Sequence, residues 1–186
     1  MRRFLSLIIF SIFLASVLSS DQANALGYKY GLFGGYNYTS FGFGELPEGL
    51  SANGNGGYVG LEGGVFLSGQ FFRPGIEISP AYVISHVNQE GESSRNIHSI
   101  FVPAYLTFSF GENNPFVDVG VGAGPLFLDL SKSTNTDLGI FAKVSPVVEV
   151  SRRLYLGPHI QFFWDMTAPS DTNIWGILAG ISLEIY

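Results

Sequence analysis

Apolar and polar residues alternate with a period of two along most of the chain. From Leu26 to Tyr38, one set of alternate positions is almost entirely aromatic or aliphatic, and the other is mixed and includes Lys29 and Asn37. A period of two is typical of β-strands whose faces meet different surroundings. The alternation recurs, so the sequence predicts eight strands, at residues 26–38, 57–68, 72–85, 96–110, 114–128, 138–151, 153–165 and 174–186.

The connections between these strands alternate in length. Long polar connections occupy residues 39–56, 86–95, 129–137 and 166–173, whereas short turns occupy residues 69–71, 111–113 and 151–153. Long loops at one end and tight turns at the other are typical of an outer-membrane barrel with both termini at the periplasmic, short-turn end. The predicted fold is all-β, an eight-stranded antiparallel up-and-down transmembrane β-barrel.

The apolar phase is sorted by depth, with aromatic residues near the strand ends and aliphatic residues between them. Amphipathic rings suit the level of lipid headgroups and aliphatic side chains suit hydrocarbon, so this phase is predicted to face lipid. The predicted aromatic belts consist of Tyr28, Tyr30, Tyr36, Tyr38, Phe72, Tyr82, Phe108, Phe110, Phe127, Phe162, Trp164 and Trp175.

A soluble, lipocalin-like barrel is the alternative to a membrane barrel. Its apolar phase would point inward around a ligand, which gives no reason for sorting by depth. The orientation of Leu106, Val121 and Ile140 separates the two folds, because these side chains point away from the cylinder only in the membrane barrel.

The opposite phase of the predicted strands carries the ionisable residues. No Lys, Arg, Asp or Glu interrupts the apolar phase, where a basic residue near mid-bilayer would cost roughly 2–4 kcal/mol. A barrel of this size is filled by its own side chains, and the inward glycines make room for rings such as Phe33 and Tyr105. The predicted interior polar cluster, structural or pore-lining, consists of Lys29, Glu62, Arg73, Glu77, Asp118, Lys143, Glu149, His159 and Glu184.

Two features of the strands bear on this cluster. If the turn at Gly69 and Gln70 sets the register, Glu62 lies opposite Glu77, with Arg73 one step away. Such a pair favours a structural salt-bridge plug, with a narrow ion or proton path as the functional alternative.

The second feature is a set of prolines within the predicted strands. Each removes a hydrogen-bond donor from the ladder and could mark a bulge that reverses the faces beyond it. These residues are Pro74, Pro80, Pro103, Pro125, Pro146 and Pro158.

Composition excludes several classes of protein. Only 13% of residues are charged, about half the share of a soluble domain. The absence of cysteine excludes a disulfide scaffold, a thiolate metal site and cysteine-linked haem. With a formal net charge of -6, the chain offers no basic surface for nucleic acid.

The N-terminus is typical of a secretory signal peptide. Arg2 and Arg3 precede an apolar run from Phe4 to Leu18, and the small-x-small sequence that ends at Ala25 suits cleavage. The run is shorter than the roughly 20 residues that a membrane-spanning helix needs. The predicted organisation is a cleaved signal peptide, residues 1–25, and a barrel domain, residues 26–186.

The segment from Asn114 to Gly124 is a Pro-aromatic strand with alternate glycines, and a basic turn at Arg152 and Arg153 follows later in the chain. With these features the chain resembles the small eight-stranded outer-membrane barrels of the OmpA and OmpX type, the outer-membrane protein β-barrel domain family, over residues 26–186. The resemblance implies the outer membrane of a Gram-negative-type bacterium, contact with its lipids and lipopolysaccharide, and biogenesis through periplasmic chaperones and the barrel-assembly machinery. The terminal Tyr186 fits the family's assembly signal imperfectly, because Glu184 shares its phase.

No enzyme is predicted, and neither a cofactor nor a metal site. Lipid A deacylases of this size use a His-x-Ser pair, and none of His86, His98 and His159 has that spacing. The expected role is structural or surface-interactive, through four long extracellular loops that contact lipopolysaccharide or an extracellular ligand, in a monomeric protein. A narrow small-solute or ion channel is the alternative, and a lipid-modifying enzyme is a weaker one.

Overall fold

The computed structural model describes residues 26–43, 51–69, 71–88, 95–111, 114–129, 134–168 and 172–186; the predicted signal peptide, residues 1–25, lies outside them. Within these residues, no helix is long and apolar enough to span a membrane. The described residues form ten β-strands: β1 (Leu26–Phe43), β2 (Ser51–Leu67), β3 (Phe72–Ile78), β4 (Ala81–Asn88), β5 (Arg95–Phe101), β6 (Ala104–Phe110), β7 (Phe116–Asp129), β8 (Thr134–Ser151), β9 (Leu154–Asp165) and β10 (Thr172–Ile185).

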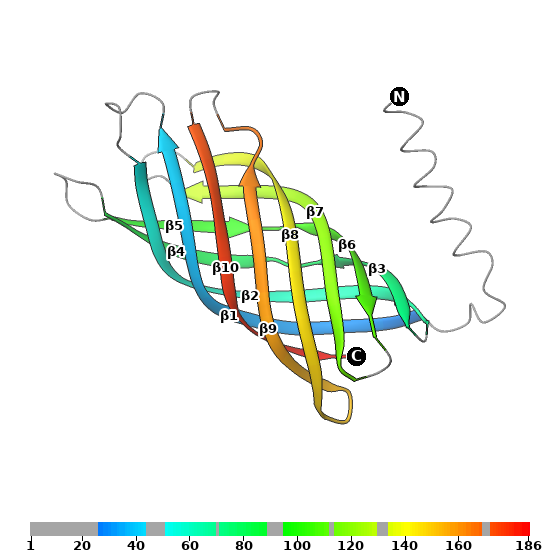
Figure 1. Cartoon of the computed structure of the whole chain (residues 1–186). Helices are drawn as coiled ribbons and strands as arrows, with labels where there is room; N and C mark the ends of the chain where they lie inside the picture. Colours follow the sequence, from blue (N-terminus) through cyan, green and yellow to red (C-terminus); the bar gives the residue numbers. More distant parts are fainter. Residues whose placement is uncertain are drawn as a thin grey trace, which may run out of the picture.

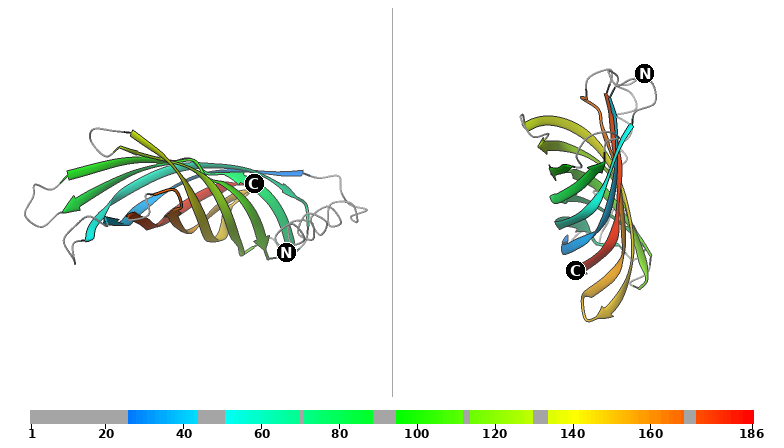
Figure 2. Two further views of the ribbon diagram at one scale, coloured as in Figure 1. Left: turned by 90° about the horizontal axis from the view of Figure 1, so that it is seen from above. Right: turned by 90° about the vertical axis from the view of Figure 1, so that its left-hand side faces the viewer.

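Antiparallel pairing joins these strands into a closed ring (Figures 1 and 2). β1 pairs with β2 on one side and with β10 on the other, and the ring continues through β9 and β8 to β7. β3 and β4 occupy one place in the ring because both pair with β2, and β5 and β6 occupy another because both pair with β7. The ring therefore has eight strand positions, which confirms the predicted eight-stranded antiparallel barrel.

The ladder partners also determine the tilt of the strands. Stepping from partner to partner around the ring, the path leaves β1 at Tyr30 and returns to it at Ser40. This stagger of ten residues at about 3.3 Å each, over eight strand spacings of about 4.8 Å, corresponds to a tilt of about 40°. Such a tilt is typical of small transmembrane barrels.

The two interruptions, between β3 and β4 and between β5 and β6, coincide with Pro80 and Pro103, which supply no ladder donor. Backbone hydrogen bonds still cross both places: Leu61 N donates to Pro80 O at 2.9 Å, and Ser79 N donates to Pro103 O at 3.1 Å. The same alternate positions are buried on both sides of each interruption. The prolines therefore break the strands without reversing their faces.

The register between β2 and β3 differs from the prediction. Glu77 pairs with Gly64 rather than with Glu62. The last pair before the connection is Phe66 with Gly75, so the turn is centred one residue later than the sequence suggested, and every partner is displaced by two residues. Glu62 and Glu77 are therefore diagonal neighbours on adjacent strands.

The loop end of the barrel has longer strands and shorter connections than predicted. β1 and β2 pair as far as Gly42 with Ser51, which leaves residues 44–50 as the first connection instead of 39–56. The connections at 89–94, 130–133 and 166–171 are also shorter than predicted. Ladder hydrogen bonds are made by the backbone, so pairing continues beyond the apolar residues that reveal a strand. The opposite, short-turn end holds the connections 68–71, 111–115 and 152–153.

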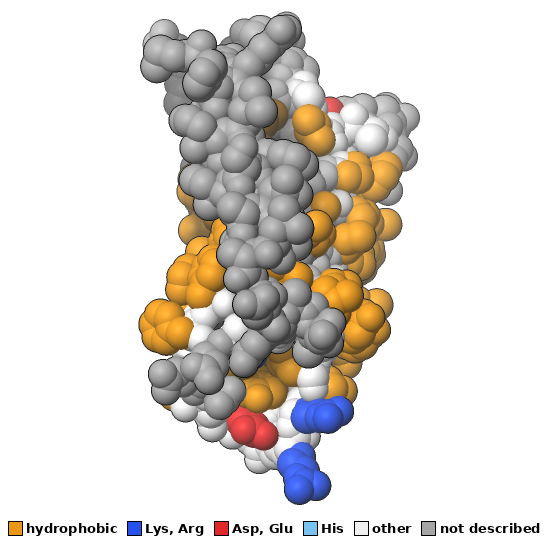
Figure 3. Space-filling model, turned by 90° about the vertical axis from the view of Figure 1, so that its right-hand side faces the viewer, with side chains coloured by type: hydrophobic (Ala, Val, Ile, Leu, Met, Phe, Trp, Pro, Cys, Tyr) orange, Lys and Arg blue, Asp and Glu red, His pale blue; other side chains and the backbone are white. Residues whose placement is uncertain are grey.

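The outward face of the barrel is apolar. Val121 is 56% exposed and Ile181 is 60% exposed, and Leu106 and Ile140 belong to the same outward set. Figure 3 shows apolar side chains along the flank, with the charged side chains of this view gathered at one end. This arrangement is the one predicted for a membrane barrel and the reverse of the one predicted for a soluble, lipocalin-like barrel.

The predicted belt residues face outward in two groups. The rings of Phe72 and Phe108, with centroids 5.6 Å apart, lie near the short-turn end. Near the loop end, Trp175 contacts Tyr38, with centroids 5.9 Å apart, and Phe162, with centroids 6.3 Å apart. Both rims of the apolar band thus carry rings in mutual contact.

Candidate functional site

Side chains fill the lumen in two zones. The zone from the middle of the barrel to its loop end is one buried hydrophobic cluster: Phe33, Phe41, Tyr58, Ala81, Val83, Val87, Ile97, Phe101, Tyr105, Leu126, Leu128, Phe141, Phe163, Ile174 and Leu178. Glycines make room for its rings, since a Cβ on Gly60 would meet the Phe33 ring and one on Gly176 would meet the Phe163 ring. The zone toward the short-turn end holds most of the buried ionisable residues, whereas Asp165 is buried at the loop end.

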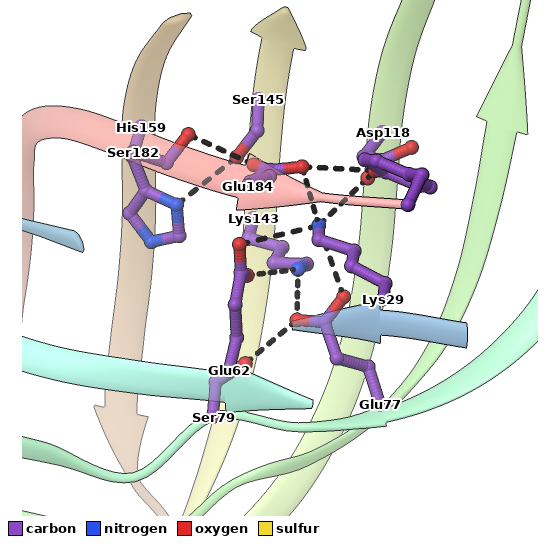
Figure 4. A network of polar contacts seen from close by, with 11 residues as sticks. Lys29, Glu62, Glu77, Ser79, Asp118, Lys143, Ser145, His159, Ser182 and Glu184 are labelled. Atoms are coloured by element: carbon purple, nitrogen blue, oxygen red, sulfur yellow. Dashed lines mark hydrogen bonds and ion pairs between the residues drawn. The ribbon is translucent and has the colours of Figure 1, made fainter. Parts of the chain in front are cut away.

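Six ionisable side chains, which we call the lumen charge cluster, lie together in that second zone (Figure 4). Each comes from a different strand, from β1, β2, β3, β7, β8 and β10 in turn, and each side chain is fully buried: Lys29, Glu62, Glu77, Asp118, Lys143 and Glu184. Alternation placed all six on the inward phase. The closed ring brings them to one level, because tilted strands carry residues of distant sequence to the same height.

Lys29 is the centre of the lumen charge cluster. Its Nζ lies 2.8 Å from Asp118 Oδ2 and 3.0 Å from Glu184 Oε2. The same nitrogen lies 3.3 Å from Glu62 Oε1 and 3.3 Å from Glu77 Oε2. Four carboxylates from four strands therefore share one ammonium group.

Lys143 supplies the second cation. Its Nζ lies 3.2 Å from Glu62 Oε2, and it also donates to Glu77 Oε1. Ser79 Oγ donates to the same oxygen of Glu77 at 2.6 Å. The two diagonal glutamates are thus bridged by both lysines, although the ladder does not place them opposite each other.

The terminal residue, Tyr186, completes the cluster from the short-turn side. Its hydroxyl lies 2.7 Å from Asp118 Oδ2 and 2.8 Å from Glu184 Oε2, so one proton serves two carboxylates. Ser182 Oγ donates to Glu184 Oε1 at 2.8 Å. The sequence placed Tyr186 on the phase of Glu184, but its aromatic ring at the chain end was interpreted only as an assembly signal.

His159 lies beside the cluster and is fully buried. Its Nδ1 is 3.0 Å from Ser145 Oγ, and its ring stacks on Phe33 with centroids 4.4 Å apart. A serine next to a histidine is the arrangement that activates a nucleophile, but both side chains are enclosed, and among the described residues no carboxylate orients the imidazole from its Nε2. The pair is therefore an interior hydrogen bond.

Two residues of the predicted cluster lie elsewhere. Arg73 sits at the short-turn mouth, with its guanidinium carbon 4.5 Å from the Phe116 ring centroid and 5.8 Å from that of Tyr186. Glu149 is exposed, and its Oε1 accepts the backbone N–H of Arg153 at 3.3 Å. The assignment of Glu149 to the interior is corrected: Glu149 keeps the regular register opposite Tyr155, but it lies beside the turn between β8 and β9, at the open rim where the lumen no longer encloses it.

The cluster's chemistry is electrostatic cross-linking. Four carboxylates and two lysines, removed from water, each need a partner, and the mutual contacts tie six of the strands together at one level. The described part of the chain holds no group of three or more His, Cys, Asp or Glu residues arranged to hold a metal ion. The lumen charge cluster lies between the mouth and the hydrophobic zone of the lumen.

No protein-family model and no curated protein matches the sequence. Among solved structures, the chain is similar to Neisserial surface protein A, with a TM-score of 0.49 and 11% identity over 87% of this chain and 99% of that chain. It is also similar to Ail, the attachment invasion locus protein of Yersinia pestis, with a TM-score of 0.45 and 9% identity over 84% and 98% of the two chains. A third similarity is to the N-terminal β-barrel domain of Pseudomonas aeruginosa OprF, with a TM-score of 0.34 and 10% identity over 84% and 97%.

Proposed function

We propose that the protein is an integral outer-membrane β-barrel whose role is structural or surface-interactive. The observation that carries this proposal is the distribution of side chains across the barrel wall. The outward face is apolar between two groups of aromatic residues, and the lumen holds the buried ionisable groups. Such a wall is stable against hydrocarbon, whereas in water it would expose a continuous apolar surface.

In the proposed orientation, the short-turn end faces the periplasm and the connections 44–50, 89–94, 130–133 and 166–171 face outward. Both described termini, at Leu26 and Tyr186, belong to the short-turn end, as Figure 1 shows for the carboxyl terminus. These connections are the surface proposed to contact lipopolysaccharide or an extracellular ligand, because binding residues are common on loops that a rigid scaffold positions.

The filled lumen favours this role over a channel. Phe101, Phe163 and Leu126 are each 1% exposed or less, and they belong to the hydrophobic cluster that fills the loop half. An ion that enters from either mouth would meet both this zone and the lumen charge cluster. A conducting path would need both to rearrange.

Epitope insertion tests the proposed topology. A tag inserted within residues 44–50 should bind antibody on intact cells, and the same tag between Glu112 and Asn113 should bind only after the outer membrane is permeabilised. The folded barrel should also migrate as a compact species on an electrophoresis gel until it is boiled. A tag pattern of the opposite sense, or a protein that remains soluble without detergent, contradicts the proposal.

Shortening the loops tests the proposed role. A variant with residues 43–50 replaced by a two-residue Asn-Gly turn should keep the compact gel species, because the ladder of β1 and β2 already extends to Gly42 and Ser51. Binding of cells to host surfaces, or of the purified barrel to lipopolysaccharide, should fall. Unchanged binding after all four connections are shortened would exclude the surface-interaction role and leave the structural one.

A further inference from the structure

The barrel wall has a step at the short-turn rim where its first and last strands meet. Tyr30 of β1 pairs with Ile185 of β10, but from Leu26 to Lys29 the ladder partners of β1 are in β2 only. β1 thus extends beyond the end of β10. The step leaves an open hollow of about 540 Å³, which we call the rim hollow.

The lining of the rim hollow is apolar on the flank and cationic at the edge. Leu26, Tyr28, Tyr30 and Ile185 are each more than half exposed and belong to the outward set that covers the barrel wall. Arg153, at the turn between β8 and β9, lines the same hollow. A cation beside apolar and phenolic side chains matches the boundary between a phosphate headgroup and acyl chains.

Arg153 adopts a backbone conformation that is unfavourable for arginine. Its φ is 62°, in the left-handed region that glycine enters freely and other residues enter at a penalty. Hairpin connections usually place glycine at a position with this φ, whereas this chain has Arg153. A non-glycine residue held in such a conformation is a pointer to function.

Hydrogen bonds on both sides hold the strained backbone in place. The Arg153 N–H donates to Glu149 Oε1 at 3.3 Å, and the Arg153 carbonyl accepts the N–H of Tyr186 at 3.2 Å. The Arg153 side chain is exposed and makes no ion pair within the described residues. The guanidinium is therefore available to a ligand, while its anchor is tied to both β8 and the chain terminus.

We propose that the rim hollow binds the headgroup of an anionic glycerophospholipid, an inference that rests on the proposed membrane location of the barrel. The Arg153 guanidinium is a bidentate partner for the phosphate, in the geometry that makes Arg–phosphate pairs strong. Tyr28 and Tyr30 lie at headgroup level, and the acyl chains follow Leu26 and Ile185 along the wall. An anionic headgroup is favoured over a zwitterionic one because it brings no choline cation to oppose the charge of Arg153, whereas the exposed Arg152 beside the turn does not line the hollow.

Native mass spectrometry of the purified barrel in detergent tests this site. The lipids would be phosphatidylglycerol and phosphatidylcholine with identical acyl chains, titrated against the wild type and the variants Arg153→Gly and Arg152→Gly. The wild type should retain one phosphatidylglycerol about tenfold more tightly than phosphatidylcholine, and Arg153→Gly should lose about that factor. Arg152→Gly, the matched control outside the hollow, should change the affinity by less than about threefold.

Three results would overturn the site. Equal losses in the two glycine variants would show diffuse attraction to a basic rim, and equal retention of both lipids would show no headgroup recognition. Binding of glycerol 3-phosphate alone with the affinity of the whole lipid would show an anion site without a lipid. Because Arg153→Gly also relieves the strained backbone, the variant should fold. The compact species on the gel checks its folding independently of lipid binding. A barrel that inserts but shows no lipid preference overturns this site alone, whereas failure to insert overturns the proposed location.

Discussion

Replacing Lys29 with methionine tests whether the lumen charge cluster stabilises the barrel. Methionine keeps most of the apolar stem of lysine and removes only the charge that four carboxylates share at 2.8 to 3.3 Å. In the variant, Glu62 and Glu77 still contact Lys143, whereas Asp118 and Glu184 contact no lysine. Two buried carboxylates would therefore lose the one cation that contacts them within the described residues, although the Tyr186 hydroxyl still lies within hydrogen-bond distance of both.

The expected loss is large because the site excludes water. Removing one partner of a buried ion pair typically costs about 3–5 kcal/mol, and the number of carboxylates affected places Lys29→Met toward the upper end of that range. The variant Lys29→Met, Asp118→Asn, Glu184→Gln should recover at least about 2 kcal/mol, since it also removes the two carboxylates that lost their cation. Arg152→Met, which removes an exposed charge at the rim, should change the stability by no more than about 0.5 kcal/mol.

Urea unfolding in phospholipid vesicles, followed by tryptophan emission, measures these differences. The two tryptophans, Trp164 and Trp175, are direct ladder partners on the outward face, so their emission reports the transfer of the barrel wall from lipid to water. A loss below about 1 kcal/mol for Lys29→Met, or a triple variant less stable than the single one, would refute the assignment of the cluster as an electrostatic cross-link.

Three further outcomes are expected. Gly60→Ala should destabilise the barrel by about 1–3 kcal/mol, because the added Cβ would meet the Phe33 ring and would lie 2.7 Å from Pro80 O. The same urea assay measures this loss, and adding Phe33→Leu to the Gly60→Ala variant should restore part of it. Purified protein in planar bilayers should show no conductance, since the hydrophobic cluster fills the loop half of the lumen; steady single-channel steps would contradict this packing. Arg153→Gly should raise the unfolding free energy by up to about 1 kcal/mol, because glycine accepts the φ of 62°, and a decrease would show that the arginine side chain supports the turn.

The faces of the strands were predictable from the sequence, but their partners were not. Alternation is a local property, so the inward phase of Glu62 and Glu77 follows from neighbours two residues away. Register depends on where a turn is centred, and moving the centre by one residue moved the partner of Glu77 from Glu62 to Gly64. Prolines at the breaks suggested reversed faces, yet the backbone carbonyl of Pro80 keeps its ladder bond and with it the alternation.

The candidate site shows the same division. Its carboxylates and lysines could be named from their phase, because a charge in a strand of this barrel avoids the lipid face. Glu149 shares that phase and the regular register, but it lies beside the turn at the open rim of the barrel, so it is exposed. The role of Tyr186 depends on closure of the ring, which brings its hydroxyl within 2.7 Å of Asp118 Oδ2, 68 residues away in sequence.

The sequence by itself determined the barrel, its eight strand positions and the side of the wall to which each strand charge belongs. These features are local, because alternation assigns each residue to one face of its strand and the cost of placing a charge in lipid keeps charged residues on the inward face. The tertiary structure decided which charges meet and where the wall is open. Closure of the tilted ring brings Lys29 to four carboxylates of four other strands, and the unequal ends of β1 and β10 create the rim hollow beside Arg153. Both depend on stagger and strand length, which arise from the whole ring and leave no local trace in the chain.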